Sequence, residues 1–133
     1  MKYLLDTNTC IRHLNRRSTA ITERLQTIDE SEIALCSIVK AELFTGAMKS
    51  DFPDRTLLRQ QAFVDRFISL PFDDSVTLVY ARLRAELEKS GKIIGANDLM
   101  IAAIAVANKL ILVTHNTREF ERVSGLTVED WEH

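Results

Sequence analysis

The chain has 133 residues, of which 46% are hydrophobic and 27% charged, with only 4 Gly and 2 Pro. This length and composition exclude a disordered chain, a collagen-like repeat and a flexible linker, and they predict one domain spanning residues 1–133. The 17 Lys and Arg against 19 Asp and Glu give a net charge of -2. An overall cationic field for nucleic acid is therefore excluded, and a polyanionic ligand needs a local basic patch or a metal ion.

Membrane association and disulfide chemistry are not expected. No apolar run approaches the roughly 20 residues of a membrane span, and the N-terminus reaches Asp6 too soon for a signal peptide. We expect a cytoplasmic protein. Cys10 and Cys36 have apolar neighbours, which favours two buried thiols over a disulfide.

The chain alternates between apolar strand-like runs and helical patterns. Strands are predicted at 3–5, 33–36, 110–113 and, at the tail, 126–128. Helices are predicted over 9–16, 19–29, 37–48, 57–68, 76–87 and from Asn97 or Asp98 to Ala107, with loops at 50–54 and 91–95. The strands lack in/out alternation, which is typical of a parallel sheet covered on both faces. The fold class is α/β.

Three helical patterns carry specific expectations about packing. Leu57, Phe63, Val64, Phe67 and Ile68 share one side of the fourth helix. On the helix over 37–48, we expect the apolar stripe to be formed by Ile38, Ala41, Thr45 and Met48. The last helix is apolar on nearly every side and is therefore expected to be buried.

Three acids stand next to these apolar elements. Asp6 directly follows the first strand, Asp98 opens the last helix, and Glu42 lies on the helix after the second strand. Strand C-termini and helix N-termini meet at one edge of a parallel sheet, so all three carboxylates are expected there. Their repulsion needs a cation, and oxygen ligands favour Mg²⁺ or Mn²⁺. Such a site suits phosphoryl chemistry.

Each acid also has an ordinary structural interpretation. Asp6 can cap a helix, Asp98 can favour a helix N-terminus through the macrodipole, and Glu42 can be a solvated helix residue. The combination at one edge of the sheet favours a site over three independent coincidences.

Four ordered motifs resemble the PIN-domain ribonucleases, and most closely the VapC toxins of bacterial toxin–antitoxin pairs. They are Leu4-Leu5-Asp6-Thr7-Asn8, Ser37-Ile38-Val39-Lys40-Ala41-Glu42-Leu43, Gly95-Ala96-Asn97-Asp98 and Leu112-Val113-Thr114-His115-Asn116 with Arg118-Glu119-Phe120. The resemblance spans nearly the whole chain. It implies a PIN-like three-layer sandwich with a central parallel sheet of four to five short strands.

The resemblance also implies an activity and partners. It implies a Mg²⁺- or Mn²⁺-dependent endoribonuclease with Asp6, Glu42 and Asp98 in the acidic pocket, a VapB-like antitoxin that occludes the pocket, and a homodimer or a larger toxin–antitoxin complex. The subgroup it resembles cuts initiator tRNA in the anticodon stem-loop. Where many members carry a fourth acid, this chain has Asn116, with Glu119 nearby to supply the missing charge.

We assign roles on this basis. Asp6 and Asp98 are expected to be the primary metal ligands, and Glu42 to orient or deprotonate the attacking water or complete the metal shell. Asn116 and Glu119 are expected to tune the pocket. RNA contacts are expected from Arg12, Arg16 and Arg17, with Arg12 and Arg16 on the helix that begins at the pocket. The histidines, His13, His115 and His133, are expected to be satisfied or solvent-facing.

Two other function classes compete. Leu4-Leu5-Asp6-Thr7-Asn8-Thr9 also resembles the haloacid-dehalogenase phosphatase signature, although Asn8 replaces its second acid. Alternatively, the acidic edge binds a basic partner peptide without catalysis.

Overall fold

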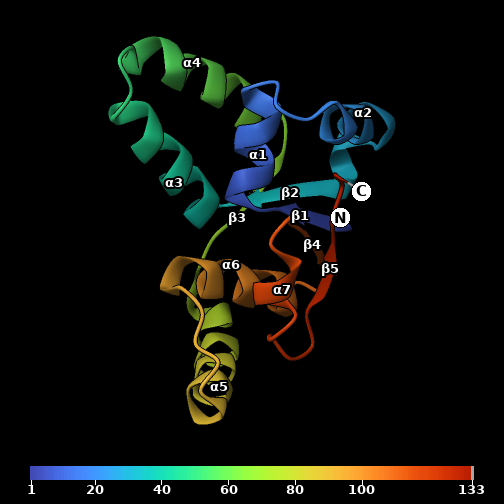
Figure 1. Ribbon diagram of the computed structural model, residues 1–133, viewed down its shortest axis with the longest axis vertical. Coiled ribbons are helices and arrows are strands. Elements are labelled where there is room, and N and C mark those ends of the chain that lie inside the picture. Colours follow the sequence, from blue (N-terminus) through green and yellow to red (C-terminus); the bar gives the residue numbers. More distant parts are fainter. Residues whose placement is uncertain (133) are drawn as a thin grey trace.

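Five short strands form one parallel sheet at the centre of the described residues, 1–132, of this computed structural model (Figure 1). The strands are β1 (Tyr3–Leu5), β2 (Ile33–Cys36), β3 (Ile68–Leu70), β4 (Ile111–Val113) and β5 (Thr127–Glu129). Their order across the sheet is β3-β2-β1-β4-β5, and each neighbouring pair is parallel. The predicted parallel sheet is confirmed, with β3 as an additional strand.

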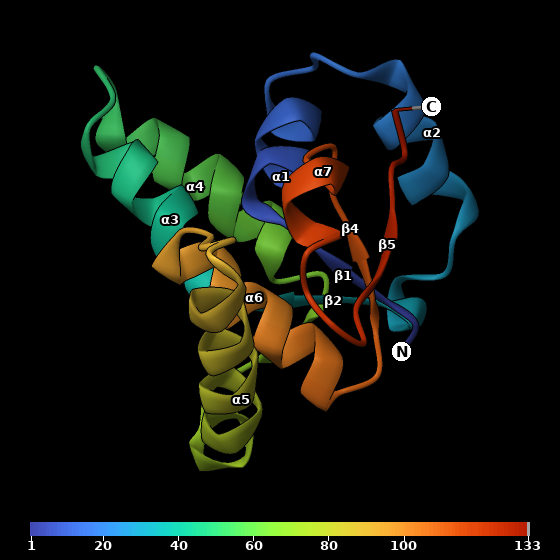
Figure 2. The same ribbon diagram turned by 60° about the horizontal axis from the view of Figure 1, so that its bottom comes forward.

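Helices cover both faces of this sheet. Their bounds are α1 (Thr7–Leu14), α2 (Thr19–Thr27), α3 (Ser37–Met48), α4 (Pro53–Val64), α5 (Asp74–Ser90), α6 (Ala96–Ala107) and α7 (Thr117–Phe120), with a 3₁₀ turn η1 at Glu30–Glu32. In Figure 1, α1 to α4 lie on one side of the sheet and α5 and α6 on the other. Figure 2 shows α5 against α6, and the two helices are in contact. The α/β class and the three-layer arrangement are confirmed.

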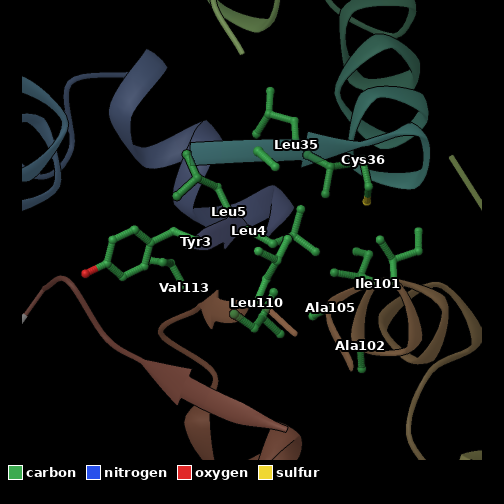
Figure 3. Close-up of a cluster of buried hydrophobic side chains, with 14 of the residues drawn as sticks. Tyr3, Leu4, Leu5, Leu35, Cys36, Ile101, Ala102, Ala105, Leu110 and Val113 are labelled. Atoms are coloured by element: carbon green, nitrogen blue, oxygen red, sulfur yellow. The ribbon is translucent and has the colours of Figure 1, made fainter. Parts of the chain in front are cut away.

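One part of the hydrophobic core lies between the sheet and α6. Leu4 of β1 and Cys36 of β2 point toward α6 in Figure 3, where Ile101 and Ala105 lie, and none of the four side chains is exposed to solvent. The small alanines let the helix axis approach the strands, and each buried leucine contributes about 1.5–3 kcal/mol through its apolar surface. This packing fixes where the N-terminal end of α6 lies relative to the strand ends.

The predicted bounds of the fourth helix were wrong at both ends. The helix begins at Pro53, inside the expected loop, because proline suits the first turn of a helix. It ends at Val64, and Ile68, expected on its apolar side, begins edge strand β3 with 51% of its surface exposed. Pairing with β2 recruits this apolar segment, and helical periodicity carries no information about such pairing.

The predicted stripe of α3 was also wrong. The buried residues are Val39, Leu43 and Ala47, whereas Ala41, Thr45 and Met48 are exposed. Helix α3 has apolar residues on several sides, so its sequence contains two sets at helical spacing, and either set could form the buried face. Only the position of the helix on β2 decides between them.

The cysteine prediction is confirmed, since Cys10 and Cys36 are both free and buried. Burial raises the pKa of the Cys10 thiol well above its usual value. In the described part of the chain, none of the helices has both the length and the apolarity to cross a bilayer.

Candidate active site

The C-terminal end of β1 is a topological switch point of the sheet. Strand β1 lies between β2 and β4, so the chain proceeds from β1 to one side and later returns to the other. Ligand sites of open α/β sheets form at such points, outside the carboxyl ends of the strands. Asp6 is the residue that follows β1 there, and its backbone N–H donates to the Val113 carbonyl of β4 at 3.1 Å.

Asp6 is both a helix cap and a buried charge. Its Oδ1 accepts the Thr9 backbone N–H at 2.8 Å, and Thr9 Oγ1 donates to the Val113 carbonyl at 3.2 Å. Burial raises the pKa of Asp6, hydrogen bonds from Thr114 and Thr9 act to lower it, and the charge of Glu42 adds to the increase. The capping interpretation is therefore correct, but it does not account for the neighbouring acid.

Glu42 joins three helices at the same edge. Thr7 Oγ1 of α1 donates to Glu42 Oε1 at 2.6 Å, and Asn97 Nδ2 of α6 lies 3.5 Å from Glu42 Oε2. The glutamate is half-buried on α3. Both of its oxygens are thus held by donors from other elements, which a solvated surface glutamate does not require.

Asp98 carries the clearest electrostatic signature of the group. It lies in the first turn of α6 and is partly exposed. Its pKa is raised to about 6, first by burial and then by the negative charges of Glu119, Glu42 and Asp6. Four carboxylates from four helices or helix ends therefore influence one another in a region we call the acidic pocket: Asp6, Glu42, Asp98 and Glu119.

The last two predicted site residues, Asn116 and Glu119, are hydrogen-bonded to each other. Asn116, which precedes α7, donates from Nδ2 to Glu119 Oε2 at 2.7 Å, and Glu119 Oε1 lies 3.4 Å from the Gly95 backbone nitrogen. Asn116 therefore orients the glutamate toward the start of α6. The amide supplies a donor, and the charge comes from Glu119.

The acidic pocket offers only oxygen donors, which suit a hard divalent cation such as Mg²⁺ or Mn²⁺. The charges of its carboxylates affect the pKa of Asp98, but within the described residues the carboxylates are not among the groups whose ligand atoms lie close together. Among residues 1–132, the group of three whose ligand atoms all lie within 4.8 Å of one another is a different one, His115, Asp130 and Glu132. The negative charges of Glu119, Glu42 and Asp6 nevertheless add to burial in raising the pKa of Asp98.

The predicted RNA-binding arginines differ in their surroundings. Arg12 of α1 donates from Nε to Glu132 and from Nη2 to the Arg17 carbonyl at 3.2 Å. The expectation that Arg16 lies on the first helix was wrong, because α1 ends at Leu14 and Arg16 adopts a left-handed backbone with φ 54°. The turn places the arginine in an open hollow, whose lining residues are Leu14, Asn15, Arg16, Arg17 and Arg59.

Arg59 is a candidate residue that sequence reasoning missed. It lies on α4 and reaches across to donate to the Leu14 carbonyl at the end of α1. No sequence spacing relates it to Arg16 or Arg17, since the contact depends on how α4 packs beside α1.

Two histidines have identifiable partners. His13 Nδ1 lies 2.9 Å from Thr22 Oγ1, its ring is 5.1 Å from Phe63, and burial lowers its pKa. His115 is largely exposed and pairs with Asp130. The expectation for His133 falls outside the described residues.

Residues 3–126 match the model of the PIN domain, and the chain belongs to the PIN-domain family. Its relatives include a tRNA(fMet)-specific endonuclease VapC of Shigella flexneri, 40% identical over 98% of both chains, and a ribonuclease VapC2 of Haemophilus influenzae with the same figures. A DNA-bound VapBC structure from Salmonella typhimurium superimposes with a TM-score of 0.94 at 39% identity, over 98% of both chains. The resemblance to VapC ribonucleases is confirmed.

These comparisons also decide between the function classes. A PIN-domain match over nearly the whole chain supports neither a haloacid-dehalogenase-like phosphatase nor a non-catalytic peptide-binding module. The phosphatase signature shares only the short strand-to-helix segment around Asp6 with this chain. That segment is common to folds in which an aspartate follows a buried parallel strand.

Proposed function

We propose that the chain is the toxin of a toxin–antitoxin pair and acts as a Mg²⁺- or Mn²⁺-dependent endoribonuclease. The observation that carries the proposal is the coupling of Asp98 to Asp6, Glu42 and Glu119 at the switch point of the sheet. Clustered carboxylates are costly to a fold unless a cation relieves their repulsion. Family membership supports an RNA-cleaving hydrolase.

Asp6, Asp98 and Glu42 are the residues that would hold the cation, with Glu119 contributing charge nearby. A bound divalent ion lowers the pKa of water, neutralises phosphate oxygens and stabilises the leaving oxygen. Asp6 is fixed for this task by its burial, by the Thr9 N–H and by its own backbone bond to Val113 of β4. Asn116 keeps Glu119 turned toward the pocket.

Glu42 is the residue we assign to the attacking water. Thr7 and Asn97 orient its carboxylate, which then accepts a proton from the water as the oxygen attacks phosphorus. The bond from phosphorus to the 3′ oxygen breaks, the 3′ oxygen takes a proton from solvent, and the products are a 5′-phosphate and a 3′-hydroxyl. A 2′,3′-cyclic phosphate end would instead show that the ribose hydroxyl attacks, and would contradict this assignment.

We propose tRNA as the substrate, with initiator tRNA cut in the anticodon stem-loop. The support is the similarity to the tRNA(fMet)-specific endonucleases of Shigella flexneri and Salmonella typhimurium, 40% and 39% identical. We place the chain in the cytoplasm, where this substrate is found. The hollow lined by Arg16, Arg17 and Arg59 offers guanidinium groups to the phosphate backbone.

We propose a VapB-like antitoxin as the protein partner, within a homodimer or larger assembly. The VapBC complexes of Salmonella typhimurium and Rickettsia felis support it, with TM-scores of 0.94 and 0.92. A cavity of about 330 Å³ opens beside Glu42 between α1, α3 and α4. Its lining combines apolar side chains such as Ile11 and Leu43 with the acid, which suits a segment that carries apolar residues and one arginine.

The test is cleavage of purified tRNA by the purified chain in Mn²⁺ or Mg²⁺, with the cut ends mapped. We expect activity that EDTA abolishes and added metal restores, and a loss of at least about 100-fold in Asp98→Asn. Thr27→Val, which alters an exposed hydroxyl at the end of α2 that bonds only the Arg24 carbonyl, serves as a control. Full activity in EDTA or in Asp98→Asn would contradict the proposal.

A further inference from the structure

A second group of metal-binding atom types lies at the same edge of the sheet, outside the acidic pocket. His115 follows β4, and Asp130 follows β5, with Glu132 two residues further on. One ligand atom from each lies within 4.8 Å of the other two. The imidazole Nδ1 is 2.9 Å from Asp130 Oδ2 and 3.3 Å from Glu132 Oε2.

The second oxygen of each of these two carboxylates accepts a hydrogen bond from elsewhere in the protein. Asp130 Oδ1 accepts the Glu132 backbone N–H at 2.9 Å, and Glu132 Oε1 accepts Arg12 Nε from α1. The two side chains are also largely shielded, with 14% and 13% of their surface exposed. The oxygens Oδ2 and Oε2 are therefore both directed to the same imidazole nitrogen.

Trp131 anchors the segment that carries both acids. It is 4% exposed, its ring meets Tyr3 of β1 edge-on at 5.3 Å, and Arg24 of α2 lies over its face at 5.2 Å. Its Nε1 donates to Glu129 at 2.9 Å. Because the tryptophan is fixed in the core, the residues on either side of it are held in place relative to His115.

We propose that His115 Nδ1, Asp130 Oδ2 and Glu132 Oε2 form a binding site for a first-row divalent cation of the zinc class. Zinc ligands at 2.0–2.2 Å in tetrahedral geometry are roughly 3.3 Å apart, close to the separations from the imidazole nitrogen. One nitrogen and two oxygens suit Zn²⁺ or Co²⁺ better than Mg²⁺, which takes oxygen ligands and retains its waters. The site differs in this from the acidic pocket.

Charge and the outer contacts agree with this assignment. Two carboxylates carry two negative charges, and one of them, Glu132, pairs with Arg12. Residues that hold ligands from behind commonly change metal affinity by roughly 10–100-fold when they are removed. The bound ion would tie the ends of β4 and β5 together, and through Glu132 and Arg12 also to α1, so it acts as a structural clamp.

The test is Zn²⁺ titration of the full chain, purified without an affinity tag, followed by calorimetry and by thermal unfolding. All proteins carry His133→Ala, so that the imidazole of the last residue supplies no ligand. His115→Asn is the diagnostic variant, since the amide can still hydrogen-bond to the carboxylates but is a poor zinc ligand. Asp98→Asn is the matched control, because it removes a carboxylate of the acidic pocket only.

We expect His115→Asn to weaken Zn²⁺ binding by about 10-fold or more and to abolish the increase in Tm caused by Zn²⁺. Asp98→Asn should retain both effects. Co²⁺ should give a visible absorption band that His115→Asn lacks, independently of any nuclease activity. The proposal is overturned if His115→Asn binds Zn²⁺ as the parent does, or if Asp98→Asn is the variant that loses the binding. Neither result bears on RNA cleavage.

Discussion

At the scale of single residues, the acidic pocket contains negative charge that does not contribute to the stability of the fold. Asp6 is useful to the fold as the cap of α1, but Asp98 is a carboxylate beside three others. Carboxylates whose pKa is raised by burial and by neighbouring negative charges are typical of functional sites, where the protein gives up some stability for chemistry. The pocket should therefore be less stable without metal than with it.

The stability cost of Asp98 predicts a pH dependence. Its pKa is about 6 in the folded chain against an ordinary 3.8, so between these values the folded chain binds more protons than the unfolded one. Stability therefore falls as pH rises through this window. Asp98→Asn should be more stable than the parent by about 1 kcal/mol near pH 8, a modest figure because solvent screens this partly exposed group.

Thermal unfolding without metal, compared at about pH 5 and pH 8, measures this effect. The Tm difference between Asp98→Asn and the parent should grow to about 3 °C at the higher pH. Added Mg²⁺ should stabilise the parent more than the variant and reduce the difference. A parent that is the more stable of the two at both pH values, in EDTA, would rule out unrelieved repulsion at Asp98.

Thr7 is a positioning residue that acts through Glu42. Its hydroxyl donates to Glu42 at 2.6 Å, so Thr7→Val removes the donor while it keeps the side-chain volume. We expect kcat for RNA cleavage to fall by about 10-fold, with KM little changed, because the glutamate loses its orientation. Thr7→Ser should restore most of the rate, whereas a purely structural role for Thr7 would leave the serine variant as impaired as the valine one.

At the scale of elements, helix ends decide where the site residues lie. Helix α5 ends at Ser90, and the next residue, Gly91, adopts a left-handed backbone with φ 72°. The following loop returns the chain to the start of α6 and Asp98. The small side chains of α6 then allow it to pack closely on β1 and β4. The turn at Gly91 and the small side chains of α6 together determine where the carboxylate of Asp98 lies.

Two glycines with equal space but different backbone conformations test this reasoning. A Cβ at Gly91 or at Gly46 would meet nothing within 4 Å. Gly91→Ala should destabilise the chain by about 1 kcal/mol because of its positive φ. Gly46→Ala, inside α3, should stabilise it by about 0.5–1 kcal/mol through helix propensity. Denaturant unfolding of both variants measures the free energies, and equal signs would contradict the backbone argument.

At the scale of the whole molecule, a net charge of -2 means that RNA must be attracted locally. Arg16, Arg17 and Arg59 gather on one hollow at the end of α1, whereas Arg12 is engaged with Glu132. The hollow and the cavity beside Glu42 share Leu14, Asn15 and Arg59. A phosphate backbone bound by the arginines would therefore lead toward the acidic pocket.

Salt dependence of RNA binding tests this path. Arg16→Ala with Arg17→Ala should weaken binding of every RNA sequence and make the slope of log affinity against log salt less negative by roughly 2, because each arginine neutralises one phosphate. Arg84→Ala is the matched control, because that arginine pairs with Glu88 and Tyr80 along α5, away from the hollow. An equal change of slope in both proteins would place the RNA elsewhere.

Local sequence patterns were sufficient to predict the fold class and the positions of the first two strands, because apolar runs without alternation occur where both faces of a sheet are covered. It also placed Asp6 and Asp98 at element ends, since a polar residue at the end of a buried run marks the edge of the sheet. The buried state of Cys10 and Cys36 followed from their apolar neighbours. These are local properties, read within a few residues.

Features that depend on contacts between distant segments could not be predicted from local patterns and became visible in the folded chain. Pairing with β2 made Ile68 part of a strand, and the seating of α3 on the sheet chose Val39, Leu43 and Ala47 as its buried face. Arg59 reached Leu14, and His115 met Asp130, across 45 and 15 residues of chain. Helical and strand periodicities describe one element at a time, whereas these contacts arise from the free energy of packing all elements together.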